Sequence, residues 1–376
     1  MRVVLFYHSL VSDWNHGNAH FLRGVAGELI ARGHQVFVYE PADGWSRENL
    51  VREHGEEAIE RFRQRYPGLD SDTYDETSLD LDEMLDGADL VIVHEWNSHD
   101  LVRRAGAHRA RNTGYRLLFH DTHHRSVTDP DSMAAYDLRH YDGVLAFGEA
   151  IRQIYLERGW AQEVWTWHEA ADTRVFRPRA GERNEGDLVW IGNWGDDERS
   201  AELREFLLAP VKELGLSARV HGVRYPEEAV LALGDSGIEY GGWLPNFEVP
   251  ETFARFRVTL HVPRRPYASV LPGIPTIRPF EAMACGIPLV SAPWEDAEGL
   301  FRPGTDYLIA RDGQEMKRHL RMLLDDSQAA SHVAAAGLET ILSRHTCHRR
   351  VSELLTIYES LAPAPFEAVL TGSARS

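Results

Sequence analysis

The chain has 376 residues, more than one ordinary hydrophobic core accommodates, which suits two domains. Its 40 Lys and Arg against 58 Asp and Glu give a formal charge of -18, so nucleic acid and anionic membranes are not expected partners through bulk charge. The two cysteines, Cys285 and Cys347, are too few for a disulfide framework or a cysteine-based zinc site.

The first half of the chain alternates short apolar runs with segments of helical periodicity. Strands are predicted at residues 2–7, 36–39, 90–93, 116–119 and 144–147, and helices at residues 21–32, 47–65, 99–111 and 149–158. Because these strands are apolar almost throughout, we expect a parallel sheet with helices on both faces. The first apolar run leads directly into Ser12 and Asp13. We therefore expect no signal peptide, no transmembrane segment and a cytoplasmic protein.

A charged stretch without periodicity, residues 171–187, is predicted to be a linker. Beyond it, strands are predicted at residues 188–191, 218–221, 258–262, 289–291 and 307–309, and helices at residues 198–208, 226–233, 249–256, 279–284, 314–324 and 348–360. The predicted fold class is therefore α/β, with two Rossmann-like, doubly wound parallel-sheet domains and a cleft between them. We place the domains at residues 1–170 and 188–346. The C-terminal helix and tail, residues 347–376, can pack back on the first domain.

Five motifs resemble those of one family. They are DTRVFRP from Asp172, GNWGDDERSAELREF from Gly192, RPFEAMACGIPLV from Arg278, FRPGTDYLIARDGQEM from Phe301 and RHTCHRRVSELL from Arg344. Together they resemble the GT-B glycosyltransferases, in particular the family 4-like group and its spore-maturation-protein (CgeB-type) branch. The resemblance implies a Leloir enzyme of the hexosyltransferase type. It also implies a nucleotide sugar bound by the second domain and an acceptor bound by the first.

Glu281 falls in the middle of a predicted helix among small and apolar residues, where an unpaired carboxylate would be costly. It either binds ligand hydroxyls or forms a buried ion pair with Arg278, one turn earlier. The resemblance implies the first role, because Glu281 matches the family's ribose-binding glutamate. The family often has a second glutamate eight positions earlier, where this chain has Gly273. The loop that ends at Thr276 is expected to turn backbone N–H groups toward the donor.

A second donor-binding segment is predicted just after the first strand of the second domain. Gly192, Asn193 and Trp194 are expected to face the cleft, with Trp194 stacked on the base or sugar. The alternative is a tight turn with an interface tryptophan. A helix begins next, and its free N–H groups suit a diphosphate, with Arg199 adding positive charge.

Adjacent arginines lie between two prolines after the predicted strand at residues 258–262. Arg264 and Arg265 are predicted, with Arg278, to meet the negative charge of a departing nucleoside diphosphate, because guanidinium groups match phosphate oxygens. The alternative is ion pairing between the domains.

Polar loops follow three strands of the first domain, at the sheet edge where this architecture binds ligands. His16, Gly17 and Asn18 precede the first helix and suit the diphosphate or the acceptor. The resemblance implies that His120 lies near the C6 hydroxyl of the transferred sugar, with Asp121 fixing its tautomer. Glu95 is another carboxylate that can deprotonate an acceptor hydroxyl.

The predicted function is metal-independent transfer of a sugar, with retention of configuration, from a nucleotide diphosphate donor to an acceptor. The default donor is a UDP-sugar, and no cofactor or metal is expected. A glycan, a protein and a small molecule all fit as acceptor, and the oligomeric state stays open. The alternatives are a nucleotide-sugar epimerase or phosphorylase of the same fold, and a non-catalytic protein that binds nucleotides or glycans.

Overall fold

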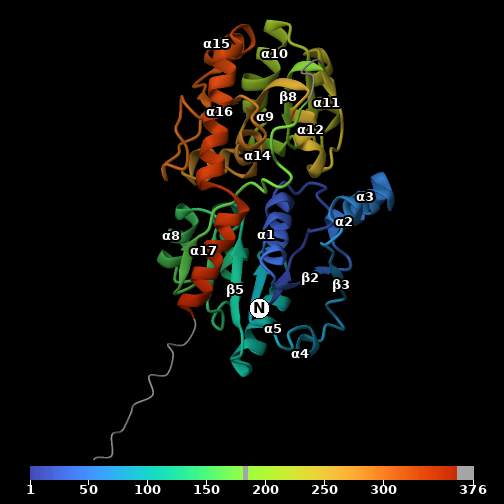
Figure 1. Cartoon of the computed structure of the whole chain (residues 1–376), viewed down its shortest axis with the longest axis vertical. Coiled ribbons are helices and arrows are strands. Elements are labelled where there is room, and N and C mark those ends of the chain that lie inside the picture. The colour runs from blue at the N-terminus through green and yellow to red at the C-terminus, as the bar shows by residue number, and fades with distance from the viewer. Residues whose placement is uncertain (181–184, 362–376) are drawn as a thin grey trace, which may run out of the picture.

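The structure is a computed structural model and describes residues 1–180 and 185–361. Two parallel sheets, each covered by helices, lie one beyond the other along the long axis of the molecule (Figure 1). The predicted fold class, α/β with two doubly wound parallel sheets, is confirmed. The predicted linker falls partly, and the tail beyond residue 361 wholly, outside the described residues.

The N-terminal lobe is the part of the chain that builds the seven-stranded sheet, with the strand order β3-β2-β1-β4-β5-β6-β7. Its strands are β1 (Arg2–Phe6), β2 (Gln35–Pro41), β3 (Asp72–Tyr74), β4 (Leu90–His94), β5 (Arg116–Asp121), β6 (Gly143–Ala146) and β7 (Val164–Thr166). Its helices are α1 (Ala19–Ala31), α2 (Trp45–His54), α3 (Glu57–Arg65), α4 (Leu81–Met84), α5 (His99–Arg111), α6 (Arg125–Thr128), α7 (Pro130–Ala134) and α8 (Glu149–Glu157). The strand order reverses between β1 and β4, which opens a crevice at the carboxyl ends of the strands.

The C-terminal lobe builds a six-stranded sheet with the strand order β10-β9-β8-β11-β12-β13. Its strands are β8 (Gly186–Ile191), β9 (Ala218–His221), β10 (Ile238–Tyr240), β11 (Phe256–His261), β12 (Leu289–Ser291) and β13 (Leu308–Ile309). Its helices are α9 (Ser200–Leu203), α10 (Ala209–Leu214), α11 (Glu227–Asp235), α12 (Val249–Phe253), α13 (Arg265–Ser269), α14 (Ile277–Cys285), α15 (Gly313–Asp325) and α16 (Ser327–Arg344). Three short helical segments are η1 (Asp196–Glu198), η2 (Arg204–Leu208) and η3 (Asn246–Glu248).

Each face of the N-terminal sheet is buried under different helices. Leu118 of β5 lies in the apolar cluster that includes Phe21 of α1. Phe119, the next residue, lies in the other cluster with Leu101 of α5 and Ile151 of α8. This is the alternation expected of a strand, and it decides where the polar residues at the strand ends point.

The last described helix, α17 (Cys347–Ser360), returns to the N-terminal lobe and packs against α1 (Figure 1). The chain crosses back next to Ala171, whose N–H donates to the carbonyl of His345 at 3.0 Å. The indole of Trp167 then donates to the carbonyl of Arg350 at 2.9 Å. None of the helices in the described part of the chain is long and apolar enough to cross a membrane.

Candidate functional site

A cavity of about 830 Å³ lies between the lobes. Its walls are segments that follow strands of both sheets, such as those at His8 after β1, Trp96 after β4, Gly192 after β8 and Val262 after β11. The carboxyl ends of the two sheets therefore face each other across this cleft. This is where doubly wound folds bind their ligands.

The cleft brings together most of the residues predicted from the sequence. Those that line it are His16, Gly17, Asn18, Gly192, Asn193, Arg199, Arg264, Thr276 and Arg278. Those that do not are Glu95, His120, Asp121, Trp194, Arg265 and Glu281.

Three arginines give the C-terminal wall of the cleft a positive charge. Arg199 donates to the carbonyl of Val262 at 3.1 Å, and burial together with the charge of Arg264 lowers the pKa of its guanidinium to about 9. Arg264 forms an ion pair with Glu198 at 2.7 Å, and Arg278 lies at the start of α14. Guanidinium groups that converge on one wall suit the oxygens of a phosphate group.

Two helices begin at the cleft, one from each lobe. No side chain caps α14, whose N-cap residue Thr276 has φ 60°. Asn18, the N-cap residue of α1, donates its amide to Thr122 Oγ1 at 2.9 Å and does not cap the helix. A Cβ on Gly17 would lie 3.1 Å from Ile277 Cγ2, so the two helix starts approach closely. Helix N-termini carry partial positive charge and add to the attraction for an anion.

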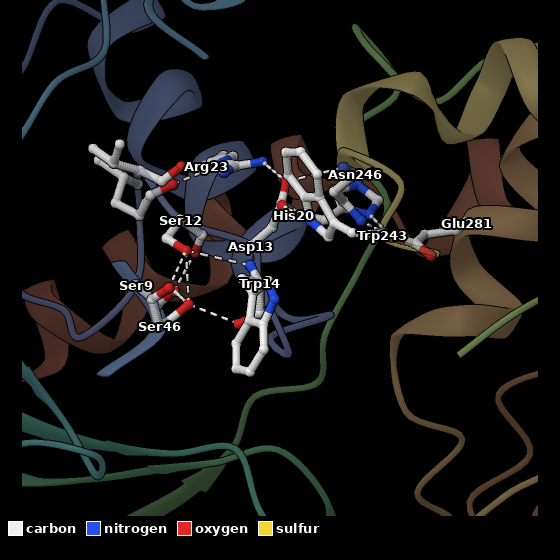
Figure 2. Close-up of polar contacts among 12 residues, drawn as sticks. Ser9, Ser12, Asp13, Trp14, His20, Arg23, Ser46, Trp243, Asn246 and Glu281 are labelled. Carbon is white, nitrogen blue, oxygen red and sulfur yellow. Dashed lines mark hydrogen bonds and ion pairs between the residues drawn. The ribbon is translucent and has the colours of Figure 1, made fainter. Parts of the chain in front are cut away.

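Glu281 does not face the cleft, in contrast to the expectation of a ribose contact. Its side chain is fully buried, and its Oε1 accepts from His20 Nδ1 at 2.9 Å and from Asn246 Nδ2 at 2.8 Å (Figure 2). Arg278 donates to the other carboxylate oxygen. Burial opposes ionisation, but the charge of Arg278 and these hydrogen bonds lower the pKa of Glu281. The alternative considered from the sequence, a buried ion pair, is what the structure contains.

Asp13 links the lobes at the edge of the same cleft. Its Oδ1 accepts from Trp243 Nε1 at 3.0 Å, and its Oδ2 accepts from the N–H of Asn246 at 2.9 Å (Figure 2). Both donors belong to the C-terminal lobe. Arg23 of α1 holds the same carboxylate at 2.9 Å from the N-terminal side.

The segment after β8 is placed partly as predicted. Gly192 and Asn193 line the cleft, and Asn193 Nδ2 donates to Asn15 Oδ1 of the N-terminal lobe at 2.7 Å. The prediction for Trp194 is wrong. Its side chain is 3% exposed and packs in the C-terminal core, where its ring centroid lies 5.8 Å from that of Tyr225. Trp194 therefore has no face free to stack on a ligand.

His120 and Asp121 also lie outside the cleft. Strand β5 extends through both residues, so their side chains point to opposite faces of the sheet. His120 packs between Phe21 and Trp167, and burial lowers its pKa to about 3. Asp121 accepts from the Tyr155 hydroxyl at 2.9 Å, and burial raises its pKa to about 6. The prediction that Asp121 fixes the tautomer of His120 is wrong.

Glu95 is turned to the same face as Asp121, away from the cleft. It is fully buried, with Arg125 Nη2 at 3.2 Å from Oε2. Burial and the charge of Asp121 raise the pKa of Glu95 well above its usual range. In this position the carboxylate cannot reach an acceptor hydroxyl in the cleft.

Arg265 points away from the cleft, although its neighbour Arg264 lines it. The Arg265 side chain is 52% exposed and pairs with Glu202 of α9 at 3.2 Å. The two guanidinium groups diverge because Arg265 begins α13 and Arg264 precedes it in an extended conformation.

Several cleft residues were not predicted as site residues from the sequence, among them Trp45, Trp96, and two neighbours of His16, namely His8 and His123. His8 Nε2 lies 3.2 Å from His16 Nδ1, and burial lowers the pKa of His16 to about 4. Burial also lowers the pKa of His8 and of His123. These rings are therefore neutral at pH 7. In residues 1–180 and 185–361, no group of three or more His, Cys, Asp or Glu is arranged to hold a metal ion.

Solved structures share this architecture over almost the whole chain. Sucrose-phosphate synthase from Thermosynechococcus elongatus has a TM-score of 0.66 at 14% identity, covering 96% of this chain and 99% of that one. HepE from Anabaena in complex with UDP and glucose has a TM-score of 0.67 at 14% identity, covering 96% and 100%. An alpha-glucosyltransferase in complex with UDP and a 13-mer DNA has a TM-score of 0.67 at 13% identity, covering 96% and 99%. The chain has the GT-B fold.

The sequence profile of the family described as glycosyl transferase-like matches residues 199–356. In this GT-B chain the matched region runs from Arg199 into α17 and includes Arg264 and Arg278 on the cleft wall. No curated protein sequence matches the chain.

Proposed function

We propose that the protein is a Leloir glycosyltransferase that moves a hexosyl group from a UDP-sugar to an acceptor hydroxyl. The observation that carries this proposal is the convergence of Arg199, Arg264 and Arg278 on one wall of the cleft. The match to a glycosyl transferase-like family over residues 199–356 supports it, and so does the UDP held by HepE. In this proposal residues 188–346 bind the donor and residues 1–170 bind the acceptor.

The arginines would stabilise the leaving group. When the bond between the sugar C1 and the diphosphate breaks, negative charge develops on the diphosphate oxygens. Donors already fixed around those oxygens stabilise this charge at little reorganisation cost. The uncapped start of α14 adds its N–H groups and dipole. Because protein groups supply this positive charge, we propose that the transfer needs no metal.

Glu281 acts in this proposal as a positioning residue. Its carboxylate holds Arg278 and Asn246, two residues that line the cleft, together with His20 of the other lobe. Removal of the carboxylate would release the guanidinium and leave buried donors without a partner. Glu281 therefore holds residues of the diphosphate site in place without touching the substrate.

Retention of configuration belongs to the same proposal. Glu95, the carboxylate first expected to act as base, lies outside the cleft, and so does Asp121. The acceptor oxygen would attack C1 from the side that the diphosphate leaves, and a diphosphate oxygen would take the acceptor proton. The product would then keep the anomeric configuration of the donor.

We further propose that the chain belongs to the family 4-like group and its CgeB-type branch, on the motifs quoted above.

The alpha-glucosyltransferase with the same fold is in complex with DNA. A formal charge of -18 argues against DNA as the acceptor of this chain, because phosphate backbones bind basic surfaces.

Calorimetric titration with UDP, GDP and dTDP, in buffer with and without EDTA, tests the proposal. We expect UDP to bind in both buffers and UDP-glucose to be hydrolysed slowly when no acceptor is present. Conversion of the donor into an isomer without release of UDP would instead identify an epimerase. If none of these nucleotides binds, the proposal is wrong.

A further inference from the structure

Glu169 is a buried carboxyl group in the cleft that no role described so far uses. It follows β7 and lies two residues before Ala171, next to which the chain returns to the N-terminal lobe. It lines the cleft and is 4% exposed. Among the described residues it has neither a hydrogen-bond nor an ion-pair partner. A buried polar group without a partner is costly and uncommon in a folded protein. Because Glu169 lines the cleft, a ligand bound there can supply the missing partner.

The surroundings of Glu169 keep its carboxyl group neutral. The charged and titratable groups that face it are Glu281 and Arg278 of α14 and Tyr267 of α13. Burial, followed by the charge of Glu281, raises the pKa of Glu169 to about 8, although Arg278 acts in the opposite direction. A protonated carboxyl group both donates and accepts a hydrogen bond, as a sugar hydroxyl does.

The backbone of this segment is held firmly. The preceding residue, His168, donates from Nε2 to the Glu298 carboxylate at 2.8 Å. Glu298 also accepts from the N–H of Glu149 at 2.9 Å. Glu298 lies against Gly273, where a Cβ would meet its Cγ at 2.7 Å. Glu298 does not line the cleft, so the carboxyl group that this corner presents to a ligand is that of Glu169.

We propose that Glu169 binds a hydroxyl group of the transferred sugar and so selects the donor. The inference rests on the proposed function and adds a residue that recognises the sugar. Arg278, assigned above to the diphosphate, acts electrostatically on Glu169 and lines the same cleft. The sugar is bonded directly to the diphosphate. With the diphosphate at Arg278, the hydroxyl groups of the sugar would lie near a carboxyl group on which Arg278 acts.

Calorimetric titration of three variants with UDP and with UDP-glucose tests this assignment. Glu169→Leu keeps most of the volume, removes the hydrogen-bonding group and leaves no buried polar atom, so we expect it to fold. Glu169→Gln keeps one donor and one acceptor and is the conservative rescue. Glu157→Gln changes an exposed carboxylate of α8, outside the cleft, and is the matched control.

Glu169→Leu should weaken UDP-glucose binding about tenfold and leave the affinity for UDP within about twofold of wild type. Glu169→Gln should retain most of the UDP-glucose affinity, and Glu157→Gln should match wild type for both ligands. If Glu169→Leu binds UDP-glucose as wild type does, this inference is wrong while the proposed function stands. If the wild-type protein binds neither ligand, both proposals are overturned.

Discussion

Arg264 and Arg265 are adjacent in the sequence but have different surroundings. A comparison of their variants therefore distinguishes a role in the cleft from an effect of surface charge. Arg264 lines the cleft, whereas Arg265 pairs with Glu202 outside it. Arg264→Ala should weaken UDP binding by about tenfold or more, because a charge-assisted hydrogen bond to phosphate is lost. Arg265→Ala removes the same formal charge and should change the affinity little. Calorimetry on both variants measures the difference, and equal effects would contradict the assignment.

Glu169 should also make the stability of the protein depend on pH. Its pKa is raised from 4.5 to about 8 in the folded state by burial and by Glu281, with Arg278 and Tyr267 as the other facing groups. The stability contributed by the protonated group is complete below the unfolded pKa and is lost as the pH rises toward about 8. Glu169→Gln does not titrate. The melting temperature of this variant, relative to that of wild type, should therefore rise between about pH 5 and about pH 9.

A melting-temperature difference between Glu169→Gln and wild type that stays constant over this range would show that Glu169 is ionised throughout. That result would contradict the claim that the carboxyl group of Glu169 is neutral in the folded protein.

Whether a polar residue faces the cleft depends on where the preceding strand ends, and an error of one or two positions changes the answer. The motifs after β4 and β5 were found from their polarity, but β5 continues through His120 and Asp121 and buries both. Trp96 and His123, slightly further along the same motifs, line the cleft instead. Apolar composition locates a strand but not its last residue, and the alternation of side chains turns a small error there into the wrong face.

At the scale of single elements, two glycines of α1 test how tightly α17 is held. A Cβ on Gly24 would meet Cys347 Sγ of α17 at 2.4 Å, whereas a Cβ on Gly27 would meet only the end of the flexible Arg174 side chain. Gly24→Ala should lower the free energy of unfolding by about 1–3 kcal/mol through overpacking. Gly27→Ala should be neutral or stabilising by up to about 1 kcal/mol, because alanine favours the helix.

Urea denaturation of both variants measures these differences. If Gly24→Ala is as stable as Gly27→Ala, α17 does not pack against α1 as described.

The central elements were predictable because they are apolar and fully buried. Strands β1, β4, β5, β9 and β12 match the predicted segments to within two residues at either end. The short strands β3, β7 and β10 were missed because each has only three residues and carries polar or aromatic side chains at a sheet edge. One long predicted helix is in fact α2 and α3, divided at Gly55, whose φ of 71° does not fit a helix.

At the scale of the whole molecule, the hydrogen bonds of Asp13 hold the lobes together around the cleft. Asp13→Asn replaces one acceptor by a donor that faces the N–H of Asn246 and the guanidinium of Arg23. The lobes should then separate more easily, and the radius of gyration measured by small-angle X-ray scattering should increase. Saturating UDP should reverse this if it bridges the lobes.

Asp137→Asn is the control for that experiment, since Asp137 pairs with Arg139 inside the N-terminal lobe. A radius of gyration that is unchanged in Asp13→Asn would show that other contacts suffice to hold the cleft closed.

The sequence could not show these contacts between lobes, because they join residues far apart along the chain. His20 and Glu281 are 261 positions apart, and Asp13 and Asn246 are 233 apart. The sequence identified Glu281 as a buried carboxylate in need of donors. It did not reveal that the other lobe and η3 supply two of them, which leaves none of the carboxylate facing the cleft.

A crystal structure of the protein with UDP bound tests the central claim most directly. The diphosphate should lie in the cleft, within hydrogen-bond distance of at least two of Arg199, Arg264 and Arg278, and Glu281 should remain paired with Arg278. UDP bound elsewhere on the molecule, or bound in the cleft with its diphosphate turned away from all three arginines, would contradict the account.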